Sequence, residues 1–194
     1  MAHDHRICSW RRAYIFDNFL RRLLHRPGKL LGPYVRPGMA VLDAGCGMGI
    51  FSIGMARLVG SKGRVVSADV QPEMLRVLRD RAERAGVGDR IETRLVAENG
   101  LGLDGPFDFA LAMWMVHEVP DRKALFEDFR RCIRPGGLLL VAEPPLHVSR
   151  AHFEESVRIA EGCGFRRVPP PRVLGSRAAL FEAPQKSARE GAGV

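Results

Sequence analysis

The 194-residue chain has no long apolar run, few aromatic residues and no closely spaced pair of cysteines. No stretch approaches the roughly 20 apolar residues that a membrane-spanning helix requires. The first ten residues also contain no apolar segment of the kind found in a secretory signal. We therefore expect a cytoplasmic protein without a membrane span.

The scarcity of cysteine bears on metal and redox chemistry. The four cysteines stand far apart, with no CxxC pair that would indicate a zinc cluster or a redox dithiol: Cys8, Cys46, Cys132 and Cys163. Among the six histidines, His3 and His5 form an HxH pair near the N-terminus, and such a pair is more typical of a solvated end than of a metal site. We expect no metal.

Acidic residues are under-represented, because 30 Lys and Arg face 22 Asp and Glu for a net charge of +8. Eight of the basic residues and only two acids lie within residues 1–36. This imbalance permits contact with nucleic acid without requiring it. The apolar fraction of 46% is that of one ordinary globular domain.

The apolar pattern alternates between short β-branched runs and longer helical periods. Strands are predicted within 39–45, 63–69, 90–96, 107–114 and 135–144, and helices within 50–60, 71–86, 121–133 and 149–164. Two extended segments around a turn follow in 165–184, and the proline triplet confines the first of them to a sheet edge. Alternation of this kind predicts an α/β fold with a doubly wound, mainly parallel sheet and helices on both faces.

Three regions are predicted along the chain. Residues 1–36 form an N-terminal helical lid segment, in which Trp10 and Tyr14 supply aromatic surface for a substrate; the alternative is an amphipathic helix packed on the sheet with its charges solvated. Residues 37–184 form the binding domain. Residues 185–194 are small and polar and are expected to be a flexible tail.

The segment "VLDAGCGMGIFS", residues 41–52, places three glycines after the first strand. Gly45, Gly47 and Gly49 permit positive φ and a close approach of backbone to a ligand or to the next helix. The spacing is G-x-G-x-G, and Ile50 stands where a dinucleotide fingerprint has its last glycine. In a doubly wound sheet this loop lines the ligand crevice.

Two acids indicate which ligand the loop serves. Asp43 precedes the glycines, where a carboxylate repels a pyrophosphate and attracts a cation such as a sulfonium. Asp69 ends the second predicted strand, where it can accept hydrogen bonds from both hydroxyls of a ribose. A ligand with a ribose and a cationic group but no phosphate describes S-adenosylmethionine.

Four motifs occur in a familiar order: "VLDAGCGMG", "VVSADVQPEML", "FDFALAMWMVHEVPD" and "IRPGGLLLVAEP". In content and spacing they resemble the class I S-adenosylmethionine-dependent methyltransferases, in particular a small type 11-like domain, over residues 36–183. The resemblance implies a Rossmann-like, seven-stranded sheet with its last strand antiparallel. It also implies transfer of a methyl group from S-adenosylmethionine, with S-adenosylhomocysteine as product.

The resemblance assigns roles to particular residues. It implies that the three glycines form the floor under the cofactor, with Cys46 among them, that Asp43 holds its amino end, that Asp69 binds the ribose and that Val70 packs on the adenine. This family often has an acidic residue after its third strand for the adenine amino group. The chain has "VAENG" there, so Glu98 is the first candidate and Asn99 the second.

The segment after the fourth predicted strand is expected at the acceptor. Met113 lies at the cofactor, Trp114 forms a wall of the acceptor pocket, and His117 is either a general base or a residue packed on the sheet. The chain lacks the [ND]PP[YF] motif of nucleic-acid amino-methyltransferases. We expect a small-molecule acceptor with an O, N or S nucleophile and a monomer or homodimer; the alternatives are an RNA-directed methyltransferase and a non-catalytic cofactor-binding protein.

Overall fold

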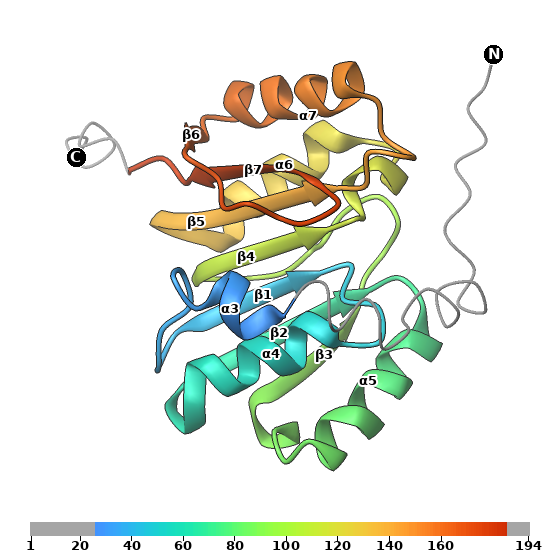
Figure 1. Cartoon of the computed structure of the whole chain (residues 1–194), viewed down its shortest axis with the longest axis vertical. Helices are drawn as coiled ribbons and strands as arrows, with labels where there is room; N and C mark the ends of the chain where they lie inside the picture. Colours follow the sequence, from blue (N-terminus) through green and yellow to red (C-terminus); the bar gives the residue numbers. More distant parts are fainter. Residues whose placement is uncertain (1–25, 186–194) are drawn as a thin grey trace, which may run out of the picture.

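A computed structural model describes residues 26–185 of the chain (Figure 1). The helices are α3 (Pro27–Leu31), α4 (Ile50–Val59), α5 (Pro72–Arg84), α6 (Arg122–Cys132) and α7 (Arg150–Gly162), with short 3-10 turns η1 (Gly60–Lys62), η2 (Gly88–Arg90) and η3 (Val116–Glu118). The strands are β1 (Ala40–Ala44), β2 (Arg64–Asp69), β3 (Ile91–Leu95), β4 (Phe107–Met113), β5 (Ile133–Glu143), β6 (Arg166–Val168) and β7 (Arg177–Glu182). The predicted lid helix before residue 26 and the tail after residue 185 lie outside the described residues.

The seven strands form one sheet in the order β3-β2-β1-β4-β5-β7-β6. Strands β1 to β5 pair in parallel, and β7 runs antiparallel to both of its neighbours. The predicted α/β, mainly parallel sheet with its last strand antiparallel is therefore confirmed. Strand β6 lies at the edge and is followed by Pro169, Pro170 and Pro171, as the missing amide hydrogens of proline require.

Helices cover both faces of this sheet, and side chains of alternating direction on each strand fill two cores. On one face, Leu31 of α3, Met55 of α4 and Leu78 of α5 pack on Val41 and Phe109. On the other face, residues of α6 and α7 pack on Leu42, Ala44, Val66 and Val141. Figure 1 shows α3 and α4 in front of the sheet and α6 behind it. Burial on both faces explains why the central strands are almost wholly apolar.

Two of the helices begin with a side-chain cap that fixes where the preceding loop ends. Asp121 accepts a hydrogen bond from the Ala124 amide at the start of α6, and Ser149 accepts one from the His152 amide at the start of α7. Such caps each stabilise a helix by about 1 kcal/mol. The loops that follow β4 and β5 lie at the same end of the sheet, because these two strands are parallel.

The strand order reverses between β1 and β4, because the chain leaves β1 toward β2 and β3 and returns on the other side. Ligands of doubly wound proteins bind outside the carboxyl ends of the strands at such a reversal. Residues 27–35 of the described chain pack beside α4, with Leu31 and Val35 buried. Within residues 26–185 no helix is long and apolar enough to span a membrane.

Candidate cofactor and acceptor site

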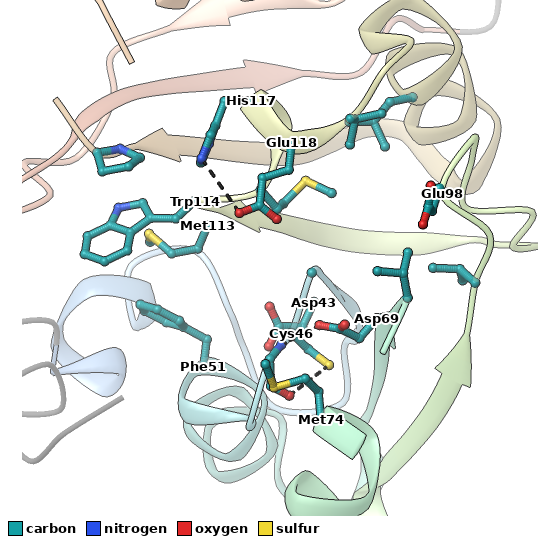
Figure 2. Close-up of a pocket in the computed structure, with 18 of the residues that line it drawn as sticks. Asp43, Cys46, Phe51, Asp69, Met74, Glu98, Met113, Trp114, His117 and Glu118 are labelled. Atoms are coloured by element: carbon teal, nitrogen blue, oxygen red, sulfur yellow. Dashed lines mark hydrogen bonds and ion pairs between the residues drawn. The ribbon is translucent and has the colours of Figure 1, made fainter. Parts of the chain in front are cut away.

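A cavity of about 540 Å³ opens at the carboxyl ends of β1, β2, β4 and β5 (Figure 2). This volume lies within the range usual for small-molecule sites. Its lining comes from the glycine loop, the ends of these strands and the loops behind them: Asp43, 45–48, Ile50, Phe51, Asp69, Val70, Met74, 96–98, Gly100, Leu101, 113–115, 117–120, Leu125, 144–147 and Gly175.

The three glycines of the loop all have positive φ, but they serve different purposes. A Cβ at Gly47 would meet no heavy atom within 4 Å, so its backbone faces open space. A Cβ at Gly45 would lie 2.7 Å from the side chain of Met115, and one at Gly49 would lie 2.0 Å from Leu78 Cδ1 on α5. Gly49 does not line the cavity and instead allows α4 and α5 to pack closely.

Asp43 lies at the bottom of the cavity and is 2% exposed. Its carboxylate accepts a hydrogen bond of 2.5 Å from the hydroxyl of Ser52, a buried residue of α4. A buried carboxylate is costly unless it is paired, and the loop and α4 hold this one where a cation in the cavity would meet it. Sequence reasoning did not single out Ser52, although it stands within the same motif.

Asp69 ends β2 and organises the glycine loop. One of its carboxylate oxygens accepts a hydrogen bond of 2.8 Å from the Gly47 amide, and the other accepts one of 2.9 Å from the Gln71 amide. Burial raises the pKa of Asp69, and hydrogen bonds from Gln71, Gly47 and Val70 counter part of that rise. Each oxygen keeps a lone pair that a hydroxyl of a ligand can use.

Most of the other residues predicted to bind the cofactor line the cavity, and one does not. Val70, Glu98 and Met113 line the cavity, and Figure 2 shows Glu98 on the opposite side of it from Phe51. Asn99 does not line it. Behind this segment the buried carboxylate of Asp128 accepts a hydrogen bond of 2.6 Å from the Leu101 amide and so holds the loop after β3 against α6.

Cys46 lines the cavity but is only 8% exposed. Burial, together with the charges of Asp43 and Asp69, raises the pKa of its thiol well above the ordinary value. The thiol therefore stays protonated at neutral pH and does not act as a nucleophile. Its backbone amide anchors the loop by donating to the Ala68 carbonyl oxygen, at 3.0 Å.

Trp114 follows β4 and forms a wall of the cavity. Its φ of 61° is rare for a residue with a side chain. Two hydrogen bonds hold this conformation: its amide donates to the Ala142 carbonyl oxygen, and its indole N–H donates to Ser176 Oγ, both at 2.8 Å. Strained backbone of this kind is concentrated at functional sites, because the surrounding structure has to impose it.

His117 lies in η3 beside two carboxylates. Its Nδ1 is hydrogen-bonded to Glu143, the last residue of β5. Its Nε2 lies 3.9 Å from Glu118 Oε1, and Figure 2 shows these two side chains facing each other. Burial alone would lower the pKa of the imidazole, but the hydrogen bond and charge of Glu143, with the charge of Glu118, raise it above the ordinary value. Sequence reasoning missed Glu143, although an acid ending the apolar run "LLLVAE" was a signal.

The cavity is acidic although the chain is basic. Four carboxylates line it, those of Asp43, Asp69, Glu98 and Glu118, and its described lining contains no lysine or arginine. Among residues 26–185 no three His, Cys, Asp or Glu side chains gather as a metal site would require. Trp10 and Tyr14, predicted to bind substrate, lie outside the described residues.

The sheet and the cavity together define a class of protein. A glycine loop after β1, an acid at the end of β2 and the strand order β3-β2-β1-β4-β5-β7-β6 belong to a Rossmann-like fold that holds a nucleoside-containing ligand at the strand ends. The buried carboxylate of Asp43 beside the glycine loop would repel a diphosphate.

Known proteins with similar sequences are methyltransferases. Residues 41–137 match the family described as "Methyltransferase domain". A ubiquinone/menaquinone biosynthesis C-methyltransferase of Vibrio vulnificus is 33% identical over 135 residues, which cover 69% of this chain and 50% of that protein. The chain thus spans about half the length of that curated relative.

Two solved structures share the fold. A SAM-dependent methyltransferase from Aquifex aeolicus is 25% identical with a TM-score of 0.79, over 91% of this chain and 98% of that one. The [4+2]-cyclase SpnF is 23% identical with a TM-score of 0.65, over 74% of this chain and 58% of that one, and shows likeness of fold alone. The chain belongs to the S-adenosylmethionine-dependent methyltransferase family.

Proposed function

We propose that the chain transfers a methyl group from S-adenosylmethionine to a small molecule bound in the cavity at the ends of β1, β2, β4 and β5. Two features of the same cavity carry the proposal: carboxylates line it, and Asp69 holds the glycine loop at its edge through the Gly47 amide. When bound, S-adenosylmethionine supplies an electrophilic methyl group on a sulfonium. The chain's task is then to hold donor and acceptor in line and to exclude water.

The residues present fit this donor. Open space in front of Gly47 lets backbone lie against a ligand, and the two oxygens of Asp69 suit the two hydroxyls of a ribose. The buried carboxylate of Asp43 suits the cationic amino end. Val70 and Glu98 are proposed for the adenine, because both line the cavity beyond Asp69.

The acceptor is proposed to bind at the other end of the cavity. Trp114 offers apolar surface for it and His117 offers a polar group, and both line the cavity. The curated relatives are named for C-methylation in ubiquinone and menaquinone biosynthesis, so a carbon nucleophile joins the O, N and S nucleophiles under consideration.

An RNA acceptor has less support. The basic residues that suggest it are concentrated in residues 1–36, whereas the cavity wall carries carboxylates that repel phosphate. A purely binding role has less support as well, because His117 lines the cavity and its Nδ1 is hydrogen-bonded to the carboxylate of Glu143, as in a general base with an orienting partner.

The test is incubation of the full chain with methyl-labelled S-adenosylmethionine and a cell extract. We expect label in the small-molecule fraction, and we expect the transfer to be lost in Asp69→Ala. Glu182→Gln, which changes a carboxylate on β7 outside the cavity, is the matched control and should retain full transfer. Label that enters only RNA, or no product at all, would contradict the proposal.

A further inference from the structure

Glu143 does not line the cavity, yet its carboxylate, at the carboxyl end of β5, is only 1% exposed. A buried charge is tolerated only where hydrogen bonds and an opposite charge compensate its lost hydration. Oε1 accepts a hydrogen bond of 2.9 Å from the Val116 amide, and Oε2 is hydrogen-bonded to His117 Nδ1. Both partners belong to η3, the turn that brings His117 into the cavity.

This pairing fixes the orientation and the tautomer of His117. With Nδ1–H donated to the Glu143 carboxylate, the lone pair of the neutral imidazole is on Nε2. His117 lines the cavity, and its side chain is 19% exposed. The arrangement of a buried carboxylate, an imidazole and an open cavity is that of a general base with an orienting partner.

We propose that Glu143 and His117 form a proton-accepting dyad, in which Nε2 of His117 takes the proton from the hydroxyl of an uncharged acceptor of the phenol or enol kind. This inference rests on the proposed methyl transfer. The acceptor oxygen keeps its electron pair and forms the bond to the methyl carbon, while the carbon–sulfur bond breaks and its pair returns to sulfur. Glu143 is a positioning residue, and it stabilises the imidazolium that results.

The acceptor class follows from the same charges. A carboxylate acceptor is already ionised at neutral pH and needs no base, and the four carboxylates of the lining would repel it. A phenol is uncharged at neutral pH and becomes a good nucleophile only after losing its proton. The need for a base and the acidic lining therefore both disfavour a carboxylate acceptor, and both are compatible with a phenol or an enol.

Within residues 26–185, further titratable groups lie near the dyad. Besides Glu118, the His147 ring lies 6.5 Å from the His117 ring, and His152 on α7 interacts with both Glu143 and His117. Arg177 stands opposite Glu143 in the backbone ladder of β5 and β7, and its guanidinium donates to the Val148 carbonyl oxygen. Arg122 is bonded to Glu155 and Ser156. Of the two carboxylates beside the His117 ring, Glu143 is hydrogen-bonded to it and Glu118 lies 3.9 Å away.

The first test needs neither cofactor nor acceptor. Nuclear magnetic resonance of the full chain follows the imidazole titrations, and the His117 signal is identified by its loss in His117→Asn. Glu143→Gln should lower the titration midpoint of His117 by about one pH unit or more, because an opposite charge is removed. Glu182→Gln should leave it unchanged. An unchanged midpoint in a folded Glu143→Gln variant would overturn the dyad.

The second test measures label transfer to the small-molecule fraction of a cell extract across pH. With a base, transfer rises as pH passes through the pKa of His117, so Glu143→Gln should move this rise to lower pH and reduce the plateau at least about tenfold. Glu143→Asp should restore part of the plateau. A merely structural role would lower the plateau without moving the rise, and that result would overturn the proposal.

The chemistry of the product tests the acceptor class. Labelled methyl esters release methanol in mild alkali, whereas aryl and enol methyl ethers do not, so alkali-stable label bound to oxygen is expected. Release as methanol, or label on carbon, nitrogen or sulfur, would overturn it. If no label enters any compound, the proposed methyl transfer fails, and the resonance titration still decides whether Glu143 governs His117.

Discussion

At the scale of single residues, Asp69 unites the structure of the loop with ligand binding. Its carboxylate holds the amides of Gly47 and Gln71 and still presents lone pairs to the cavity. Removing it therefore has two costs, because the ligand loses acceptors and the glycine loop loses its anchor. Hydrogen bonds to charged groups are worth about 1.5 to 3 kcal/mol each.

We predict that Asp69→Ala weakens binding of S-adenosylmethionine at least about tenfold, which corresponds to about 1.4 kcal/mol. Isothermal calorimetry measures the dissociation constant directly. The matched control is Asp89→Ala, which removes an exposed carboxylate in η2 and should leave affinity unchanged. Equal affinity of Asp69→Ala and the unaltered chain would show that the ribose assignment is wrong.

The raised pKa of Asp69 gives binding a pH dependence. A protonated carboxyl loses its charge and one acceptor, so affinity is full above this pKa and declines as pH falls through it. Because burial raises the pKa, the decline begins at a higher pH than an ordinary aspartate would give. Calorimetry from about pH 4 to about pH 8 measures this decline in affinity for S-adenosylmethionine. In Asp69→Asn the dependence should flatten, and an undiminished slope would assign it to another group.

At the scale of elements, the start of α4 shows why the glycine pattern serves packing as well as binding. Gly49 is the N-cap of α4 in a left-handed conformation and lies directly against Leu78 of α5. Gly86, after α5, has a similar φ of 67°, but a Cβ there would meet open space. A side chain added at either position would strain the backbone, but only one added at Gly49 would also clash with a neighbouring residue.

We predict that Gly49→Ala lowers the free energy of unfolding by about 2 to 5 kcal/mol, as strain and overpacking add. Gly86→Ala should cost only about 1 to 2 kcal/mol, because strain acts alone. Urea denaturation of the two variants measures the difference. Equal losses would mean that contact with α5 is unimportant.

The sequence predicted every described strand and the helices α4 to α7, because apolar period, proline and glycine mark these elements locally. Of the loop residues that it predicted for the cofactor, Gly45, Cys46, Gly47 and Glu98 line the cavity, whereas Gly49 and Asn99 do not. It did not predict the pairing of His117 with Glu143, since these residues are 26 positions apart and meet only when β4 and β5 align. Nor did it predict the strained φ of Trp114, which Ala142 and Ser176 impose from elsewhere.

At the scale of the whole molecule, a basic chain surrounds an acidic cavity. The net charge of +8 attracts polyanions to the surface, while carboxylates in the cavity favour cationic or uncharged ligands. We therefore expect RNA at the surface to leave the affinity of the cavity for its ligand unchanged.

We predict that labelled polyuridine binds with an affinity that falls steeply between about 50 and 200 mM salt, as nonspecific contacts do. Saturating polyuridine at low salt should not change the dissociation constant for S-adenosylhomocysteine. Fluorescence anisotropy and calorimetry measure the two quantities. Competition between the two ligands would instead place RNA in the cavity.

The central claim is that the cavity is built for a sulfonium nucleoside and against a dinucleotide. Calorimetric titration of the full chain with S-adenosylmethionine, and separately with NAD⁺, tests it most directly. The account predicts a dissociation constant of about micromolar order for S-adenosylmethionine and no detectable heat for NAD⁺, because four carboxylates and no cation line the described cavity. Binding of NAD⁺ without binding of S-adenosylmethionine would contradict it.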